Sequence, residues 1–405
     1  MNKKLYRLGV AFSSAALIAS SFLTPALALN VEISGNGASS ENEVEVKTES
    51  EVKVEQDNDA DIDNNIDIDA DTGGNSASWN TGGDVKIDTG DATSDVKVTN
   101  VANANTAEVS SCCPGDLSVT IKDNGAYSEN EVEYKSEQEV EVDQDNDADI
   151  DNDVDVDADT GDNKANSNTN GSVEIKTGSV DSSVTVDNTV NLNSARLTGS
   201  NGGATLSVEI AGNGASSENE VEIKLEHEVE VDQDNDADID NDVDVDAETG
   251  DNKASWNTGG EVVIDTGDVV SKVDLSTLAN FNSADVDSCG CIFDEDSWVK
   301  IKDNGAFSEN EFELETETEV KAEQDNDADI DNDADVDGDT GDNKVKGTTV
   351  GDDPTIETGA SNSDVTVENE VNSNVLNGGD LNLPELPGLG ESAYTLFALF
   401  LAMFS

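Results

Sequence analysis

Two sequence motifs recur four times along the chain at nearly constant spacing, and this repetition constrains the fold more than any other feature. The first motif, Asn-Gly-Ala-x-Ser-Glu-Asn-Glu, begins at Asn36, Asn124, Asn213 and Asn304. The second motif, Gln-Asp-Asn-Asp-Ala-Asp-Ile-Asp, begins at Gln56, Gln144, Gln233 and Gln324. Successive copies of both motifs are 88, 89 and 91 residues apart. Self-similarity at a fixed period is typical of stacked or tandem units, so we expect four copies of one folding unit.

The repeats and the two ends divide the chain into six segments. We expect an export signal at 1–28, repeat units at 29–111, 112–200, 201–288 and 289–377, and a spacer with an apolar, anchor-like tail at 378–405. The second and fourth units each begin with a linker that contains two cysteines.

The N-terminal segment has the three parts of a secretory signal peptide. Lys3, Lys4 and Arg7 precede an apolar stretch over residues 8–23, and the small-residue site Ala26-Leu27-Ala28 follows. This order predicts cleavage after Ala28 and a secreted or extracellular protein. The alternative, a membrane anchor, is disfavoured because the stretch is interrupted by serines and is shorter than the roughly 20 residues that a span requires.

The charge balance restricts the partners. The chain carries 92 acidic and 20 basic residues, a formal net charge of −72. Removal of residues 1–28 leaves −75, because that segment has three basic residues and no acidic ones. Nucleic acid is excluded as a partner, since its binding depends on a basic surface, and anionic lipid is disfavoured. Membrane contact is expected only through the C-terminal tail, if that tail is an anchor.

The acidic residues alternate strictly with uncharged ones. From Glu43 to Asp71 every odd position holds Glu, Asp or Lys, except Asn65, and the even positions hold small apolar, hydroxyl or amide residues. Period two places alternate side chains on opposite faces of a β-strand. High net charge with few aromatic residues is also typical of disorder, but disorder does not require such alternation. We therefore predict strands with acids facing outward and small apolar and amide residues facing inward.

Polar residues interrupt the inward face at Thr48, Gln56 and Asn64. Because strands usually run 3–10 residues, these interruptions predict short strands joined by bends. The predicted fold class is all-β, a tandem-repeat β-solenoid similar to a parallel β-helix, whose stacked rungs would place inward amides in ladders. The alternative is a string of antiparallel β-sandwich modules, favoured by the unit length and the Gly-rich turns.

Carboxylates at every second position give the only pattern with metal-binding chemistry. In the second copy they are Asp145, Asp147, Asp149, Asp151, Asp153 and Asp155, and in the fourth Asp333, Asp335 and Asp337. Ca²⁺ takes 6–8 oxygen ligands, which carboxylates on adjacent strands could supply. The fourth copy does not form an EF-hand loop, because Lys344 occupies the twelfth position, where a glutamate is required. The alternative to a specific calcium site is a solvated acidic face with a diffuse cloud of cations.

The four cysteines, Cys112, Cys113, Cys289 and Cys291, lie between units and are disulfide candidates in an exported chain. Bridges within either pair would close strained rings, so bridges between copies or between chains are favoured over them. The C-x₂-C spacing of zinc sites is missing. The single histidine, His227, shares the parity of inward residues, and the other copies carry unrelated residues at its position. No localised catalytic constellation stands out, and no enzyme activity or cofactor other than Ca²⁺ is expected.

Two segments resemble known bacterial proteins. Ile-x-Thr-Gly followed by Val-x-Val-x-Asn-x-Val-Asn, at residues 175–191, resembles poorly characterised acidic repeats of secreted and surface proteins of bacteria. Leu386-Pro387-Gly388-Leu389-Gly390 resembles the Leu-Pro-x-Thr-Gly signal of sortase-anchored wall proteins, with leucine in place of threonine and without the basic tail. The resemblances imply an exported surface or matrix role, and we interpret the tail as an incomplete anchor rather than a degenerate end.

The expected function is therefore a non-enzymatic secreted or cell-surface protein, structural or adhesive, that forms an elongated acidic stalk. Its expected partners are extracellular or cell-envelope surfaces and further copies of itself. The alternative is a Ca²⁺-dependent binding or matrix protein that uses the Asp ladders.

Overall fold

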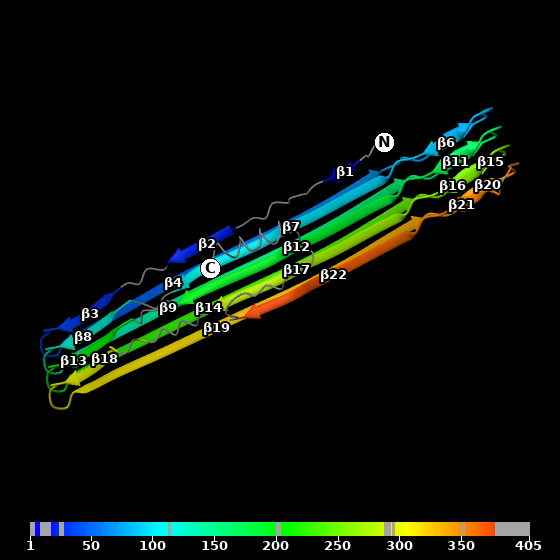
Figure 1. The fold of residues 1–405 in the computed structure, drawn as a ribbon. Helices are drawn as coiled ribbons and strands as arrows, with labels where there is room; N and C mark the ends of the chain where they lie inside the picture. Colours follow the sequence, from blue (N-terminus) through cyan, green and yellow to red (C-terminus); the bar gives the residue numbers. More distant parts are fainter. Residues whose placement is uncertain are drawn as a thin grey trace.

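The computed structural model of the chain describes residues 5–8, 18–23, 28–111, 115–199, 204–286, 293, 296–349, 351 and 353–376. These residues form twenty-two β-strands and no helix. The chain coils four times, and each coil stacks on the previous one with parallel strands (Figure 1). The prediction of an all-β, parallel solenoid is confirmed, and the alternative of antiparallel sandwich modules is wrong.

Each coil, which we call a rung, contains five strands. Rung 1 comprises β3 (Leu29–Ser34), β4 (Glu41–Asp69), β5 (Ser76–Ser78), β6 (Val85–Asp88) and β7 (Ala92–Ser111). Rung 2 comprises β8 (Leu117–Lys122), β9 (Glu129–Asp159), β10 (Lys164–Asn166), β11 (Val173–Lys176) and β12 (Val180–Gly199). Rung 3 comprises β13 (Leu206–Ala211), β14 (Glu218–Glu248), β15 (Lys253–Ser255), β16 (Val262–Asp265) and β17 (Val269–Val286). Rung 4 comprises β18 (Trp298–Lys302), β19 (Glu309–Asp339), β20 (Lys344–Lys346), β21 (Thr355–Glu357) and β22 (Ser361–Leu376).

Equivalent residues of successive rungs are direct neighbours across the sheets. Gln56 pairs with Gln144, Gln144 with Gln233, and Gln233 with Gln324. The repeat period of the sequence is therefore the length of one coil. Because a one-residue slip would turn every acidic side chain into the core, the alternation excludes any shift of this register by an odd number of residues.

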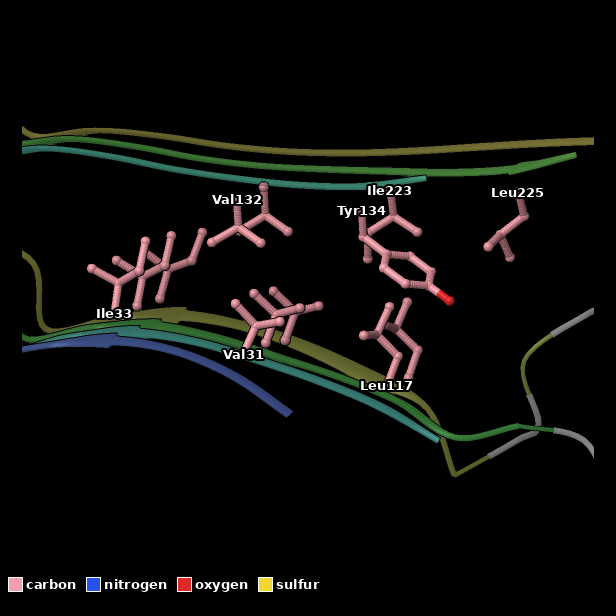
Figure 2. Packing of buried hydrophobic residues seen from close by; sticks show 13 residues of the cluster. Val31, Ile33, Leu117, Val132, Tyr134, Ile223 and Leu225 are labelled. Atoms are coloured by element: carbon pink, nitrogen blue, oxygen red, sulfur yellow. The ribbon is translucent and has the colours of Figure 1, made fainter. Parts of the chain in front are cut away.

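Each rung is a flattened loop with two walls. The long strand β9 forms one wall, and β12 and β8, which run end to end, form the other (Figure 1). Apolar side chains fill the space between the walls, as where Tyr134 of β9 faces Leu117 of β8 and Val132 of β9 faces Val31 of β3 (Figure 2). Each wall contributes one layer of side chains to the core, so the core is narrow and extends along the whole rung.

Asparagine and glutamine ladders cross this core. The side-chain amide of Asn58 donates to Oδ1 of Asn146 at 3.0 Å, and Asn146 donates to Asn235 at 2.9 Å. Asn146 also donates across the core to Asn193 at 2.7 Å. These amides are almost fully buried, and each is paired both along the stack and across it. The prediction of inward amide ladders is confirmed.

The long strands are a departure from the predicted architecture. β4 runs 29 residues, and β9, β14 and β19 each run 31, where we expected short strands joined by bends. The inward amides in the columns of Gln56 and Asn64 do not bend the chain, because each is hydrogen-bonded to its equivalents in the neighbouring rungs. With their polarity satisfied inside the core, the strand continues straight through them.

Two further strands precede the rungs. β1 (Leu5–Leu8) and β2 (Ile18–Leu23) pair with the outer edge of β7, at 93–96 and 105–110. They lie in the segment for which we predict an export signal, and that prediction stays untested. Among the residues that the structure describes, no helix has the length and apolar content needed to cross a membrane.

Candidate functional site on the acidic sheet

The outer face of the sheet formed by β4, β9, β14 and β19 carries the densest charge of the molecule. We call residues 57–71, 145–159, 234–248 and 325–339 of this sheet the acidic field. The field has eight outward carboxylates in each of rungs 2 to 4 and seven in rung 1, where Asn65 interrupts the series. It contains no basic residue. Among the described residues, no lysine or arginine forms an ion pair with a carboxylate of the field.

The register arranges these carboxylates in straight columns. Asp145 is paired with Asp57 and Asp234, and Asp234 is paired with Asp325. Neighbouring strands are about 4.8 Å apart, and alternate residues of one strand are about 6.6 Å apart. The field is therefore a two-dimensional grid of carboxylates on a nearly flat sheet.

All nine predicted site residues belong to this grid. The residues Asp145 to Asp155 of the second copy lie on β9, and those of the fourth copy lie on β19. Asp153 stacks on Asp242, which stacks on Asp333, so the two predicted sets share columns. Within the described residues, however, no three His, Cys, Asp or Glu side chains converge in a way that could hold a metal ion. The carboxylates point the same way, side by side, and do not surround a common point.

The grid raises the proton affinity of its own members. Partial burial raises the pKa of Asp145, and the neighbouring charges of Asp234 and Asp57 add to the effect. The same causes, burial first and stacked carboxylates second, raise the pKa of Asp147, Asp240 and Asp244. Like charges held this close repel one another, so the carboxylates of the field raise the electrostatic free energy of the folded chain.

The strongest perturbation lies at the end of the field. Asp71, Asp159, Glu248 and Asp339 occupy equivalent positions just before the Thr-Gly turn. Burial raises the pKa of Asp159 to about 6, even though its carboxylate accepts a hydrogen bond from the backbone N–H of Gly161. Burial, with the charge of Asp159, raises the pKa of Glu248 to about 7.

On the same sheet, the carboxylates that precede the acidic field along the long strands are partly neutralised by lysines. Lys47 pairs with Glu137 at 2.9 Å and Lys53 pairs with Glu141 at 2.9 Å, each across one rung boundary. Between rungs 2 and 3, Lys135 pairs with Glu226 at 3.2 Å. Uncompensated charge is therefore concentrated in the acidic field.

His227 lies on the inward face, as its parity predicts, and only 5% of its surface is exposed. Neither ring nitrogen has a hydrogen-bond partner, and burial lowers the pKa of the imidazole. Its column contains Gln138 in rung 2 and Thr318 in rung 4. The four cysteines lie outside the described residues, as does the C-terminal tail, so the predictions made for both stay predictions.

Exposed aromatic side chains at the two ends of the rungs were not assigned a role by the sequence analysis. Trp79 and Trp256 are 81% and 63% exposed in equivalent turns at one end, two rungs apart. Tyr127 and Phe307 are 69% and 91% exposed at the other end, also two rungs apart. All four have positive φ, between 57° and 64°. The sequence feature that marks the two tryptophans is the Ser-Trp-Asn-Thr-Gly-Gly motif, which occurs in copies 1 and 3 alone.

Comparison with protein-family models, with curated proteins and with solved structures finds no match to this chain.

Proposed function

We propose that the protein is a non-enzymatic structural or adhesive protein that acts outside the cell, as a stiff acidic blade. The observation that carries this proposal is the regularity of the molecule. Four rungs repeat one surface in register, the carboxylates of the acidic field are equivalent along each column, and exposed aromatic residues occur at both ends of the rungs. Such a surface suits repeated weak contacts with an extended partner.

The long axis of the blade lies along the strands and not along the stack. A strand of 31 residues is about 100 Å long, whereas four stacked rungs are about 19 Å thick. The exposed aromatic residues lie at the two ends of this long axis. Tryptophan and tyrosine offer large rigid contact surfaces at low entropic cost, which supports a contact role for the ends.

Export can be tested directly. The chain produced with its own N-terminal segment in a bacterial host is expected outside the cytoplasm, with a mature N-terminus at Leu29. N-terminal mass spectrometry of the fractions measures both. A full-length chain that stays inside the cell would remove the extracellular role.

Adhesion is tested with protein-coated beads on cell surfaces and polysaccharide films. Retention is expected for the unmodified chain and a clear loss for Trp79→Ser/Trp256→Ser, because rung 2 carries Ser167 at the equivalent position and serine fits that turn. Asp149→Asn, on the acidic field, is the matched control and is expected to keep retention at the aromatic end. Equal retention of all three would contradict adhesion through that end.

Our second candidate function is that of a Ca²⁺-dependent matrix protein. It is favoured by the stacked carboxylates, whose mutual repulsion adds to the effect of burial in raising their pKa values, because a divalent cation between two columns would relieve that repulsion. Thermal unfolding in CaCl₂ is expected at a higher temperature than in NaCl of equal ionic strength, and chelator is expected to reverse the difference. Coinciding curves would rule this candidate out and leave only a diffuse cation cloud.

A further inference from the structure

We call the side of rung 4 that faces away from rung 3 the outer face of rung 4. Among the described residues, no further rung covers it. Val299 and Ile301 of β18 are 43% and 47% exposed, whereas their counterparts in rung 3, Val208 and Ile210, are fully buried. Val365 and Val367 of β22 are likewise about half exposed. Among the described residues no strand lies beyond β18, β19 or β22. The same inward side chains that rungs 2 and 3 bury between neighbours are therefore open to solvent on one side of rung 4.

Two asparagine ladders have hydrogen bonds that all point along the stack toward this face. Asn64 donates to Asn152, Asn152 to Asn241, and Asn241 to Asn332, at 2.8, 2.7 and 2.7 Å. Every step of this series donates from one rung to the next, whereas the glutamine series from Gln56 to Gln324 donates from each rung to the preceding one. The asparagine series that begins at Asn42 and ends at Asn310 runs the same way as the series from Asn64. Rung 4 thus ends the two asparagine ladders with amide N–H groups that have no following rung among the described residues.

Rung 1 presents the complementary groups. Among the described residues no rung precedes the Oδ1 atoms of Asn42 and Asn64, and these atoms stand at the register positions of Asn310 and Asn332. Donors on one face therefore match acceptors on the other. Two copies of rung 1, or two copies of rung 4, would bring like groups together.

We propose that the outer face of rung 4 binds rung 1 of a second copy of this chain, so that the solenoid continues from one molecule into the next. The contact would repeat the one that already joins successive rungs, with parallel strands in the same register. Such a head-to-tail interface is heterologous and leaves a free face at each end. The product is an open filament, with strands perpendicular to its axis and an advance of about 19 Å per chain. This interface is independent of the extracellular role proposed above.

The N-terminal strands control access to the rung 1 face. β1 and β2 occupy part of the outer edge of β7, which β22 of the second copy would need. Within the part of the chain that the structure describes they pair with β7 alone, so the pairing between the described rungs does not depend on them. Removal of residues 1–28 is therefore expected to open the face without unfolding the stack.

Glycines supply variants that block one face at a time. A Cβ on Gly125 would lie 2.3 Å from the backbone nitrogen of Ala38 in the preceding rung, whereas a Cβ on Gly37, the rung 1 equivalent, meets nothing within 4 Å. Gly37→Ala is therefore expected to fold, but to place its methyl group where the second copy's rung 4 backbone must lie.

Gly341 is the corresponding position on the rung 4 face. A Cβ on Gly250 would lie 2.2 Å from the carbonyl oxygen of Gly341 in the following rung, whereas a Cβ on Gly341 meets only the flexible carboxylate of Asp339, at 3.1 Å. Gly341→Ala is therefore expected to fold and to block the opposite partner.

The experiment compares chains that begin at Leu29, in NaCl at 1 M, where the Debye length of about 3 Å screens the stacked acids. Sedimentation velocity and electron microscopy are expected to show filaments for the unmodified chain. Gly37→Ala and Gly341→Ala are each expected to remain monomers with unchanged circular dichroism. Their equimolar mixture is expected to form dimers and nothing longer, because one intact face remains on each variant.

The control variant is Tyr127→Ser, at an exposed turn where rungs 1 and 3 already have serine at the equivalent position. It is expected to form filaments. The full-length chain is expected to assemble less than the chain from Leu29. The proposal is overturned if the unmodified chain stays monomeric at every concentration, which would mean that residues 377–405 or another protein cover rung 4. It is equally overturned if both glycine variants, still folded, assemble like the unmodified chain.

Discussion

At the scale of single residues, the amide ladders carry more of the specificity of the core than its apolar side chains do. Asn146 donates to Asn193 and Asn235, and it accepts from Asn58 and Asn105, all within 3.0 Å. Removal of the Asn146 amide would break all four of these bonds at once, two along the stack and two across the core. Such networks fix one register, because any shift would leave buried amides unpaired.

Asn146→Ala is expected to lower the free energy of unfolding by about 3 kcal/mol, since removal of one partner leaves buried polar groups unsatisfied. Urea denaturation followed by circular dichroism measures the loss. Asp149→Ala, on the same strand but on the exposed face, is the control and is expected to change stability by less than about 0.5 kcal/mol. Equal effects of the two substitutions would show that the ladder does not stabilise the fold.

Stability is expected to fall as pH rises from about 4 to about 7. Burial raises the pKa of Asp159 to about 6 and that of Glu248 to about 7, so the folded chain binds more protons in this window than the unfolded chain does. The stabilisation from these protons is complete below the unfolded pKa values and is lost as pH passes through the folded ones. Melting temperatures at pH 5 and pH 8 measure the slope. Asp159→Asn/Glu248→Gln is expected to flatten it, and an unchanged slope would argue against this column as its source.

At the scale of structural elements, close stacking of the turns sets the separation of the rungs. The Asn-Gly-Ala turns that precede the long strands stack backbone on backbone, and only glycine leaves room for this in rungs 2 to 4. The same motif occurs in all four copies, but its glycine is required only where a preceding rung is present. The position in the stack, and not the local sequence, decides which glycine matters.

Gly125→Ala is expected to destabilise the chain by about 2 kcal/mol, because its methyl group would force two rungs apart. Gly37→Ala, in the identical motif, is expected to have almost no effect on the monomer. Thermal unfolding at concentrations where both chains are monomeric makes the comparison. A loss of stability in both variants would point to a local requirement of the turn.

At the scale of the whole molecule, the flattened rungs make the protein a blade. A compact globule of this length has a radius of gyration of about 21 Å, whereas a rod as long as one 31-residue strand, about 100 Å, already exceeds about 28 Å. Small-angle scattering of Gly37→Ala, which is expected to stay monomeric, should give the larger value in low and in high salt. A compact value would contradict the flattened rung, and a value that rises steeply at low salt would indicate expansion by charge repulsion.

The sequence alone determined the number of units, the strand conformation and the face on which each side chain lies, because these follow from a period of about 90 residues and a period of two. The inward parity of His227 and of the amides was predicted on the same basis. The tertiary structure decided that the long strands are straight, since Asn64 and Gln56 are satisfied by residues that lie 36 to 88 positions away.

Only the stack also shows which acids repel one another, which glycines are in close contact and which rung face is left open. Each of these depends on what lies in the next rung, and a local pattern along one strand carries no information about that neighbour.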